Sequence, residues 1–550
     1  MSQAPSPRQD RVVGVTVPLF SLRSESSWGI GEIGDLPAFA SFVASAGISL
    51  IQLLPLAEIS GGGTSPYSAL SAFGIDPMFI SLAPVADLKH LSTREVLGGK
   101  GVAELEAARH SSTVDYKVVR ALKRKALAAG LRRFVDHELA AGAQASPRAR
   151  AFMDFCEAQR HWLPDYALYR AIKDARGGAA WWEWPDPLRE RDRAALRGAA
   201  ATYAEAILFY EYVQWLAHAQ WAAARAELKK LGVEIMGDLP FMVDRDSADV
   251  WVHHKEFRMD MSVGVPADQF DEDGQDWGLP PYHWRVMQAN DFAWLRRRAA
   301  YSGQLYDRFR IDHLVGFFRT YMRPYERRRG DNGKLVPGTF DPQAEAEQEA
   351  HGLRVVGAMI ESAAERGARL IAEDLGSIPP YVGPALQKLG APGYKVLIWE
   401  KDGDKFRDPA AYPALSVACY GTHDTAPVTV WWEELAPAER AEVLRLPGLQ
   451  GHGPKDSPDP LGPTFTTEVH AALMKLICGA GSDLVLLLIQ DVLGVKDRIN
   501  KPSTVGEHNW TYRLPQPIEK LRSDPHVKGA LARVRAAVVA GGRRLPPGGT

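Results

Sequence analysis

Eight short apolar runs recur along this chain, and most are continuously apolar instead of alternating with polar residues. They span residues 12–17, 49–54, 233–237, 306–311, 369–372, 395–399, 417–420 and 484–490. A strand that is apolar on both sides is covered on both faces, as in a parallel sheet. The runs therefore predict eight buried strands, which constrains the fold more than any other feature of the sequence.

Helical patterns separate several of these runs. Residues 37–46 follow the first run, residues 352–366 precede the fifth, and residues 466–478 precede the eighth. Alternation of strand and helix is typical of an α/β protein, and eight repeats indicate a (β/α)8 TIM barrel. We expect the barrel to extend over residues 12–530.

Uneven spacing of the runs predicts insertions into the barrel. The longest gap, between the second and third runs, has amphipathic patterns that predict a helical insertion over residues 85–205. Residues 243–285 are rich in Asp, Gly, Pro and aromatic residues. Since loops after the strands form the catalytic face of such barrels, we expect a loop-rich insertion over the active site. The termini, residues 1–11 and 540–550, are expected to be flexible.

Charge and cysteine content exclude several classes of protein. Lys and Arg number 65 and Asp and Glu number 67, so the net charge is -2 and nothing favours a nucleic-acid partner. The three cysteines have no CxxC spacing, which favours a reducing compartment over a disulfide scaffold. No signal region opens the chain, and no apolar run approaches the ~20 residues that span a bilayer. We expect a cytoplasmic protein without a membrane partner.

Three carboxylates follow apolar runs: Asp312, Glu373 and Asp424. Because the carboxyl ends of barrel strands meet at one face, the three acids are expected to share one active site. Two neighbouring carboxylates can cleave a glycosidic bond, one as nucleophile and the other as proton donor. In a retaining enzyme the two carboxyl groups are expected to lie about 5–5.5 Å apart.

The surroundings of two of these acids suit opposite roles. Arg310 and Asp312 are two residues apart on a strand and project to the same side, where the guanidinium favours an ionised nucleophile. The alternative is a structural ion pair at the end of a strand. Glu373 follows a very apolar run, and burial together with the charges of Asp374 and Asp312 is expected to keep it protonated near neutral pH. The alternative for Glu373 is an ordinary carboxylate at the start of a helix.

Asp424 and its neighbour His423 are suited to bind sugar hydroxyls. A Ser-His-Asp hydrolase is the alternative, but no G-x-S-x-G motif supplies a nucleophilic serine. A catalytic metal is not expected, since His253 and His254 belong to no HExxH motif or spaced Cys/His cluster. Trp277 lies in a Gly-rich loop and is expected to contact a ligand through its flat apolar face.

Short motifs follow one another in a fixed order over most of the chain. They include S-W-G-I-G at 27–31, Q-L-L-P-L at 52–56, S-P-Y-S at 65–68, G-D-L-P at 237–240, G-Q-D-W-G at 274–278, R-I-D-H at 310–313, A-E-D-L-G at 372–376, G-T-H-D at 421–424 and N-K-P at 500–502. This ordered set resembles the 4-α-glucanotransferases, also called amylomaltases or disproportionating enzymes, of the α-amylase superfamily.

The resemblance implies a reaction and a role for each site residue. Asp312 would be the nucleophile, Glu373 the acid/base and Asp424 the stabiliser of the transition state. The substrate-binding residues would be Tyr67, Asp238, Trp277, Arg310, His423 and Asn500. Such an enzyme needs no cofactor. It moves α-1,4-linked glucosyl or dextrin units from a donor maltodextrin to the 4-OH of an acceptor glucan or glucose.

Two other functions stay open. An amylase-like hydrolase would share the same intermediate, and a catalytically silent glucan-binding protein would share only the binding residues. We expect a monomer or a small homo-oligomer.

Overall fold

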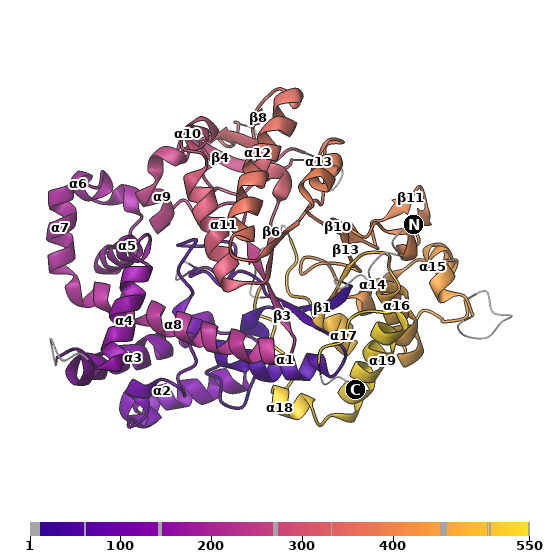
Figure 1. The fold of residues 1–550 in the computed structure, drawn as a ribbon, viewed down its shortest axis with the longest axis horizontal. Helices are drawn as coiled ribbons and strands as arrows, with labels where there is room; N and C mark the ends of the chain where they lie inside the picture. Colours follow the sequence, from indigo (N-terminus) through magenta and orange to yellow (C-terminus); the bar gives the residue numbers. More distant parts are fainter. Residues whose placement is uncertain are drawn as a thin grey trace, which may run out of the picture.

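An eight-stranded parallel sheet forms the centre of this computed structural model, which describes residues 11–547 except 60–61, 141–145, 268–272, 332, 452–458, 503, 505 and 507 (Figure 1). The strand order is β10-β13-β14-β1-β2-β3-β6-β9. The strands are β1 (Val12–Thr16), β2 (Leu50–Gln52), β3 (Glu234–Leu239), β6 (Arg308–Ile311), β9 (Arg369–Ala372), β10 (Gly393–Val396), β13 (Ser416–Cys419) and β14 (Leu484–Leu488). All eight predicted runs therefore form strands of this sheet, and the predicted TIM barrel is confirmed. β10 lies earlier in the chain than predicted.

The sheet closes between β9 and β10, the two strands at the ends of the order. The Ala372 N–H donates to the Pro392 carbonyl over 2.9 Å. The Tyr394 N–H donates to the Asp374 carboxylate over 2.6 Å. These two bonds join the end strands, so the sheet forms a barrel instead of presenting two open edges.

The inside of the barrel is filled by side chains from alternate strand positions. They are Val12, Leu50, Met236, Ile371, Tyr394, Val396, Val417, Cys419, Leu484 and Leu486, and all are buried. Gly14 in β1 contributes no side chain, and an added Cβ would lie 2.7 Å from the Leu486 Cδ2 atom. The barrel interior is thus a packed core, and ligands are expected at its mouths.

Helices cover the outside of the barrel, and the three predicted from sequence correspond to α1, α12 and α16. The helices on or beside the barrel are α1 (Leu36–Ala44), α8 (Ala204–Lys230), α10 (Trp284–Ala289), α11 (Ala293–Leu305), α12 (Glu345–Ala364), α13 (Val382–Leu389), α14 (Val428–Glu434), α15 (Pro437–Leu444), α16 (Thr467–Cys478), α17 (Ile489–Leu493), α18 (Ile518–Leu521) and α19 (Pro525–Ala540). Helix α16 begins where the Thr466 hydroxyl accepts the Val469 N–H, which satisfies one of the first-turn donors. In the part of the chain that the structure describes, no helix is both long and apolar enough to cross a bilayer.

In the described residues, six helices precede α8 between β2 and β3, and they gather on one side of the barrel, at the left of Figure 1. They are α2 (Thr93–His110), α3 (Tyr116–Phe134), α4 (Pro147–Ala158), α5 (Leu163–Ala175), α6 (Asp186–Arg189) and α7 (Arg193–Thr202). We propose residues 85–205 as the extent of this helical insertion.

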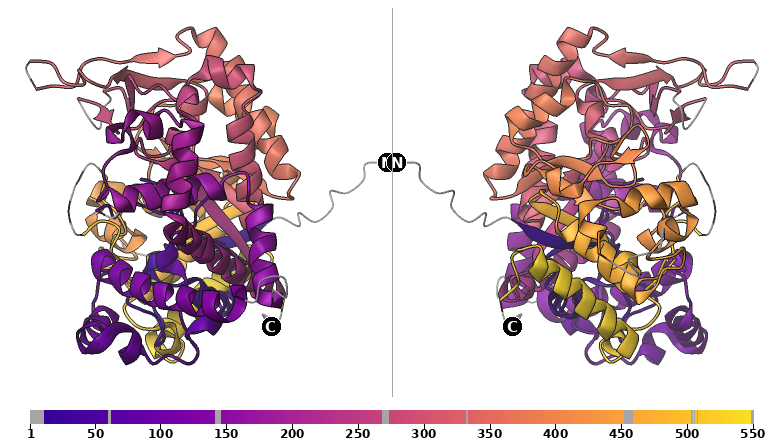
Figure 2. Two further views of the ribbon diagram at one scale, coloured as in Figure 1. Left: turned by 90° about the vertical axis from the view of Figure 1, so that its left-hand side faces the viewer. Right: turned by 90° about the vertical axis from the view of Figure 1, so that its right-hand side faces the viewer.

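A small antiparallel sheet lies at the end of the molecule opposite α2 and α18 (Figures 1 and 2). Its order is β5-β4-β7-β8, with β4 (Met261–Val265), β5 (Gln275–Asp276), β7 (Thr320–Pro324) and β8 (Thr339–Asp341). The segment 243–285 therefore contains strands β4 and β5 and the short helix α9 (Ala248–Val252) as well as loops. Residues 268–272 of it lie outside the described residues. A second short hairpin, β11 (Lys401–Asp402) and β12 (Lys405–Phe406), follows β10.

In the C-terminal segment Arg543 and Pro546 are buried, and flexibility of residues 540–550 stays a prediction. Arg543 is only 4% exposed, and its guanidinium donates to the carbonyls of Cys478 (2.7 Å) and Ala480 (2.8 Å). These bonds satisfy a buried charge and fix the chain after α19. Residues 1–10 and 548–550 lie outside the described residues.

Candidate active site

Strand register places Asp312 and Glu373 side by side at the carboxyl end of the barrel. Ile311 pairs with Ala372 in the parallel ladder between β6 and β9, and the two acids are the next residues along each strand. The Glu373 N–H still donates to the Ile311 carbonyl over 3.0 Å, so the ladder continues past the strand ends. Neighbouring strands lie about 4.8 Å apart, which brings the two acids to the same level on adjacent strands.

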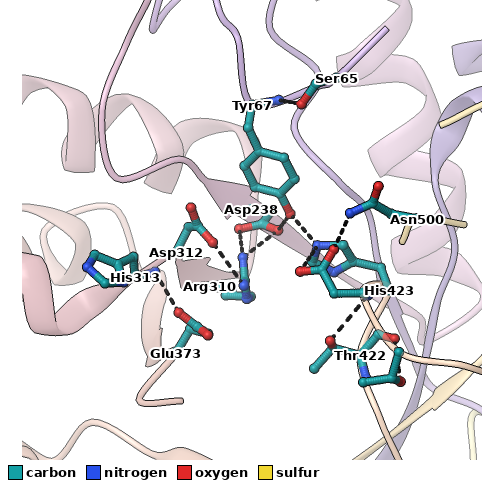
Figure 3. A network of polar contacts seen from close by, with 12 residues as sticks. Ser65, Tyr67, Asp238, Arg310, Asp312, His313, Glu373, Thr422, His423 and Asn500 are labelled. Atoms are coloured by element: carbon teal, nitrogen blue, oxygen red, sulfur yellow. Dashed lines mark hydrogen bonds and ion pairs between the residues drawn. The ribbon is translucent and has the colours of Figure 1, made fainter. Parts of the chain in front are cut away.

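Arg310 is the centre of a buried charge network (Figure 3). Its Nη1 donates to both carboxylate oxygens of Asp238, over 2.7 and 2.9 Å, and its Nη2 lies 3.0 Å from Asp312 Oδ1. The Tyr67 hydroxyl also donates to Asp238, over 2.8 Å. Burial raises the pKa of Asp238, and the contacts from Arg310 and Tyr67 oppose that rise. Burial disfavours the guanidinium charge, but Asp238 and Asp312 raise the pKa of Arg310 well above its ordinary value. Arg310 thus holds Asp312 while its own charge is balanced by Asp238.

Glu373 has the opposite setting. Burial raises its pKa to about 8, and the negative charges of Asp312 and Asp424 add to the rise. The backbone N–H of His313, a residue with φ of 45°, donates to Glu373 Oε2 over 2.7 Å and fixes the carboxyl group. Asp374 is not among the main causes of this rise, and its carboxylate accepts the Tyr394 N–H of β10. The structure therefore pairs a buried carboxyl of raised pKa with an acid held by a guanidinium.

Asp424 belongs to the same network through His423. The Tyr67 hydroxyl lies 2.9 Å from His423 Nε2, and since this hydroxyl donates to Asp238, it accepts from Nε2. The same Nε2 atom lies 3.4 Å from Asp424 Oδ2. Asn500 Nδ2 donates to the other oxygen of Asp424 over 2.6 Å. The rings of Tyr67 and His423 stack with centroids 5.7 Å apart, so packing and hydrogen bonds together fix the two side chains.

Trp277, the last predicted binding residue, is half-buried directly after β5. Its ring meets the His313 ring edge to face, with centroids 4.9 Å apart, and its indole N–H donates to Gln275 Oε1 over 3.0 Å. His313 follows Asp312 in sequence, so this contact links the small antiparallel sheet to the acids. Contact between Trp277 and a ligand stays a prediction.

Two positioning residues do not stand out in the sequence. Arg498 donates to the carbonyl of Asp424 over 2.7 Å and to that of Asn500 over 3.2 Å, and so ties two site loops together. Trp510 packs against both Tyr67 and His423, with centroids 5.7 and 5.9 Å apart. Arg498 is two residues before Asn500, so its proximity to the site could be inferred from the sequence. Its bonds go to backbone oxygens, however, and no sequence pattern reveals these bonds.

Loss of the Asn500 amide is expected to weaken catalysis without unfolding the protein. In Asn500→Leu the Asp424 Oδ1 atom loses its 2.6 Å donor, which frees the carboxylate to rotate. A lost hydrogen bond to a charged group is worth about 1–3 kcal/mol, so kcat/KM should fall about 10- to 100-fold. The surface substitution Gln387→Leu is the control. Wild-type kcat/KM in the Asn500→Leu variant would show that Asn500 has no role in the site.

Over residues 11–547, apart from the gaps given above, no group of three His, Cys, Asp or Glu residues is arranged to hold a metal ion. His253 lies with its Nδ1 atom 3.6 Å from Glu256, and both side chains are partly buried.

Comparison with known proteins agrees with the geometry of the site. The family model described as 4-alpha-glucanotransferase matches residues 17–519. The 4-alpha-glucanotransferase of Thermus thermophilus is 34% identical over 503 residues, which cover 88% of this chain and 92% of the relative. That of Synechocystis is 31% identical over 506 residues, covering 89% and 92%. The structure of amylomaltase from Streptococcus agalactiae in complex with acarbose is similar with a TM-score of 0.79 at 26% identity, covering 97% of this chain and all of that one. The chain belongs to the 4-alpha-glucanotransferase family, the amylomaltases, and is a transferase acting on α-1,4-glucans.

Proposed function

We propose that Asp312, Glu373 and Asp424 carry out the transfer by retaining double displacement. The observation that carries this proposal is the pair on β6 and β9, in register on adjacent strands but in opposite electrostatic settings. Arg310 lies 3.0 Å from Asp312, whereas burial raises the pKa of Glu373 to about 8. An ionised carboxylate beside a protonated one is what a retaining glycosidase mechanism needs at neutral pH.

In the first step Glu373 gives its proton to the glycosidic oxygen of the donor glucan. Asp312 attacks the anomeric carbon, the glycosidic bond breaks, and the glucosyl or dextrin unit becomes an ester of Asp312. The shortened glucan leaves with the proton. In the second step the 4-OH of an acceptor glucan or glucose attacks the same carbon, Glu373 takes the hydroxyl proton, and Asp312 is released. Two inversions give overall retention.

The remaining site residues bind the reacting glucose. Asp424, held by Asn500, is placed to accept from sugar hydroxyls, and contacts of this kind strengthen as the ring approaches the oxocarbenium-like transition state. His423, Tyr67 and Asp238 form one chain of hydrogen bonds. The side chains that bind the sugar hydroxyls are therefore fixed before the substrate arrives. Trp277 supplies a flat face for a neighbouring sugar ring.

Either an acceptor sugar or water can release the ester of Asp312. Exclusion of water therefore decides between transfer and hydrolysis. The small sheet reaches the acids through the Trp277–His313 contact. On the same barrel face, Trp399 in the loop after β10 is 52% exposed. We propose that an apolar sugar face covers this indole and displaces water.

Incubation with maltotriose tests this function. Transfer is expected to give glucose and a ladder of dextrins longer than the substrate, resolved by anion-exchange chromatography. The Asp312→Asn protein is the matched control and should leave maltotriose unchanged. Products no longer than maltotriose would indicate a hydrolase, and binding without any product would indicate a silent glucan-binding protein.

We also propose that the protein is cytoplasmic and that maltodextrin is its donor. All three cysteines, Cys156, Cys419 and Cys478, are free thiols in the structure, which suits a reducing compartment.

A further inference from the structure

Trp510 has a backbone conformation that is unusual for a large side chain. Its φ is 65°, in the left-handed region that glycine adopts readily and bulky residues rarely adopt. Such a residue stays in this region only where the surrounding structure fixes it, and residues of this kind gather at functional sites. The contacts that fix Trp510 are therefore candidates for a role in the reaction.

The indole of Trp510 is the third ring of a cluster in the active site. Its centroid lies 5.7 Å from that of the Tyr67 ring and 5.9 Å from that of the His423 ring. The Tyr67 and His423 rings in turn stack on each other. Trp510 is only 9% exposed, so its ring is packed within the protein. A shift of this ring would leave both neighbouring side chains freer to move.

Both backbone polar groups of Trp510 are hydrogen-bonded. Its N–H donates to the carbonyl of Ile499, the residue before Asn500, over 2.9 Å. Its carbonyl accepts from the Tyr116 hydroxyl over 2.6 Å, in a buried contact. The first bond joins Trp510 to the loop of Asn500, whereas the second joins it to helix α3 of the helical insertion.

Tyr116 is itself held firmly, as the first residue of α3. The side chain of the preceding residue, Asp115, accepts the Val118 N–H over 3.0 Å and caps the helix. The Tyr116 ring meets the Phe20 ring edge to face, with centroids 6.1 Å apart, and Tyr116 is only 7% exposed. Its hydroxyl is thus a fixed donor to the Trp510 carbonyl.

The segment after Trp510 is docked on the insertion by other bonds. The Val114 N–H donates to the Thr511 carbonyl over 3.0 Å. The buried Arg513 guanidinium donates to two carbonyls at the C-terminal end of α2, each over 2.8 Å. None of these bonds uses the Tyr116 hydroxyl, so its removal releases the Trp510 carbonyl and leaves the segment docked.

We propose that Tyr116 is a positioning residue for the transfer reaction, because its hydroxyl keeps Trp510 in the left-handed conformation. The Trp510 indole in turn holds the rings of Tyr67 and His423 in place. The helical insertion then supports the subsite of the reacting glucose from outside the barrel. This role rests on the proposed function, in which Tyr67 and His423 bind that glucose, and a site fixed before substrate arrives loses catalysis when it is loosened.

The variant Tyr116→Phe removes only the hydroxyl and tests the proposal. The Trp510 carbonyl loses its donor, and kcat is expected to fall about three- to tenfold, an effect of the size of one lost hydrogen bond. KM should stay within about twofold of the wild type, because contacts with the reacting glucose tighten in the transition state. Initial rates of glucose release from maltotriose give both constants.

Tyr212→Phe is the matched control, because the buried Tyr212 hydroxyl donates to Asp87 of the helical insertion over 2.8 Å. This variant should lower the Tm at least as much as Tyr116→Phe does, since its lost bond goes to a carboxylate. It should leave kcat unchanged. Equal kcat values in the two variants would mean that the Tyr116 bond only stabilises the fold, and would overturn the proposal.

A double variant tests whether Tyr116 acts through Trp510. Trp510→Leu removes the indole and should lower kcat by itself, and adding Tyr116→Phe should then cause no further loss. If Tyr116→Phe lowers kcat by the same factor in both backgrounds, Tyr116 does not act through Trp510 and the proposal is wrong. Circular dichroism verifies folding, and if Trp510→Leu does not fold, the comparison with Tyr212→Phe decides. Failure of the proposed function would be seen in the wild type instead, as a missing dextrin ladder.

Discussion

Asp312→Asn is expected to lower kcat for dextrin transfer by about 10⁴-fold or more, because an amide cannot form the glycosyl ester. The substitution is close to isosteric, and the amide oxygen can keep the 3.0 Å contact that Asp312 Oδ1 makes with Arg310. The fold and the glucan subsites should therefore survive. Glucose release from maltotriose measures the loss, and titration with a longer maltodextrin should show binding close to that of the wild type.

Two further measurements separate a nucleophile from a structural acid. Asp291→Asn removes a carboxylate that is 77% exposed, and should leave kcat unchanged. Mass spectrometry of the wild-type protein quenched during turnover should find glycosyl mass on the peptide that contains Asp312, and none in the variant. If Asp312→Asn turns over at the wild-type rate, or if the glycosyl group is found on another residue, the nucleophile is wrongly assigned.

The barrel could be predicted from the sequence because strands covered on both faces leave a strong apolar signal. The displaced strand β10 shows where that signal fails. The run 395–399 stays apolar after the strand ends at Val396, and its last residue, Trp399, is 52% exposed in a loop. Apolarity marks contact with other apolar groups and does not mark strand geometry. Strands β7 and β8 were not predicted, since only one of their faces is covered and their residues are partly exposed.

Positions of site residues were more predictable than their orientations. Glu373 and Asp374 are adjacent acids, and adjacent residues at a strand end point to opposite sides, so only one can face the site. Which one does is decided by β10, whose Tyr394 N–H binds Asp374. The bonds from Arg498 to the Asp424 and Asn500 carbonyls likewise depend on loops that are distant in sequence. Contacts of this kind follow from tertiary structure and leave no local pattern.

Glu373 is expected to set the alkaline limit of activity. Burial raises its pKa from 4.5 to about 8, so at pH 7 the group holds the proton that the leaving oxygen needs. The kcat/KM value for maltotriose should be level near pH 7 and fall tenfold per pH unit above about pH 8. Glu373→Gln should lose about 10²- to 10⁴-fold in kcat, the usual contribution of a general acid, and should lack this alkaline limb in its residual activity. The exposed substitution Glu365→Gln should keep the wild-type profile.

The same raised pKa predicts an effect on stability, which gives a second readout. Between pH 4.5 and about 8 the folded protein keeps a proton that the unfolded chain releases, so stability falls as pH rises through this window. Above about pH 8 Glu373 is ionised in the folded protein as well, and the free energy of unfolding is lowered by the full cost of burying its carboxylate. Glu373→Gln has no carboxylate to ionise, so its Tm should exceed that of the wild type by a margin that grows from pH 5 to pH 8 and then levels off. A constant margin across this range, together with an alkaline limb retained in the variant, would show that another group donates the proton.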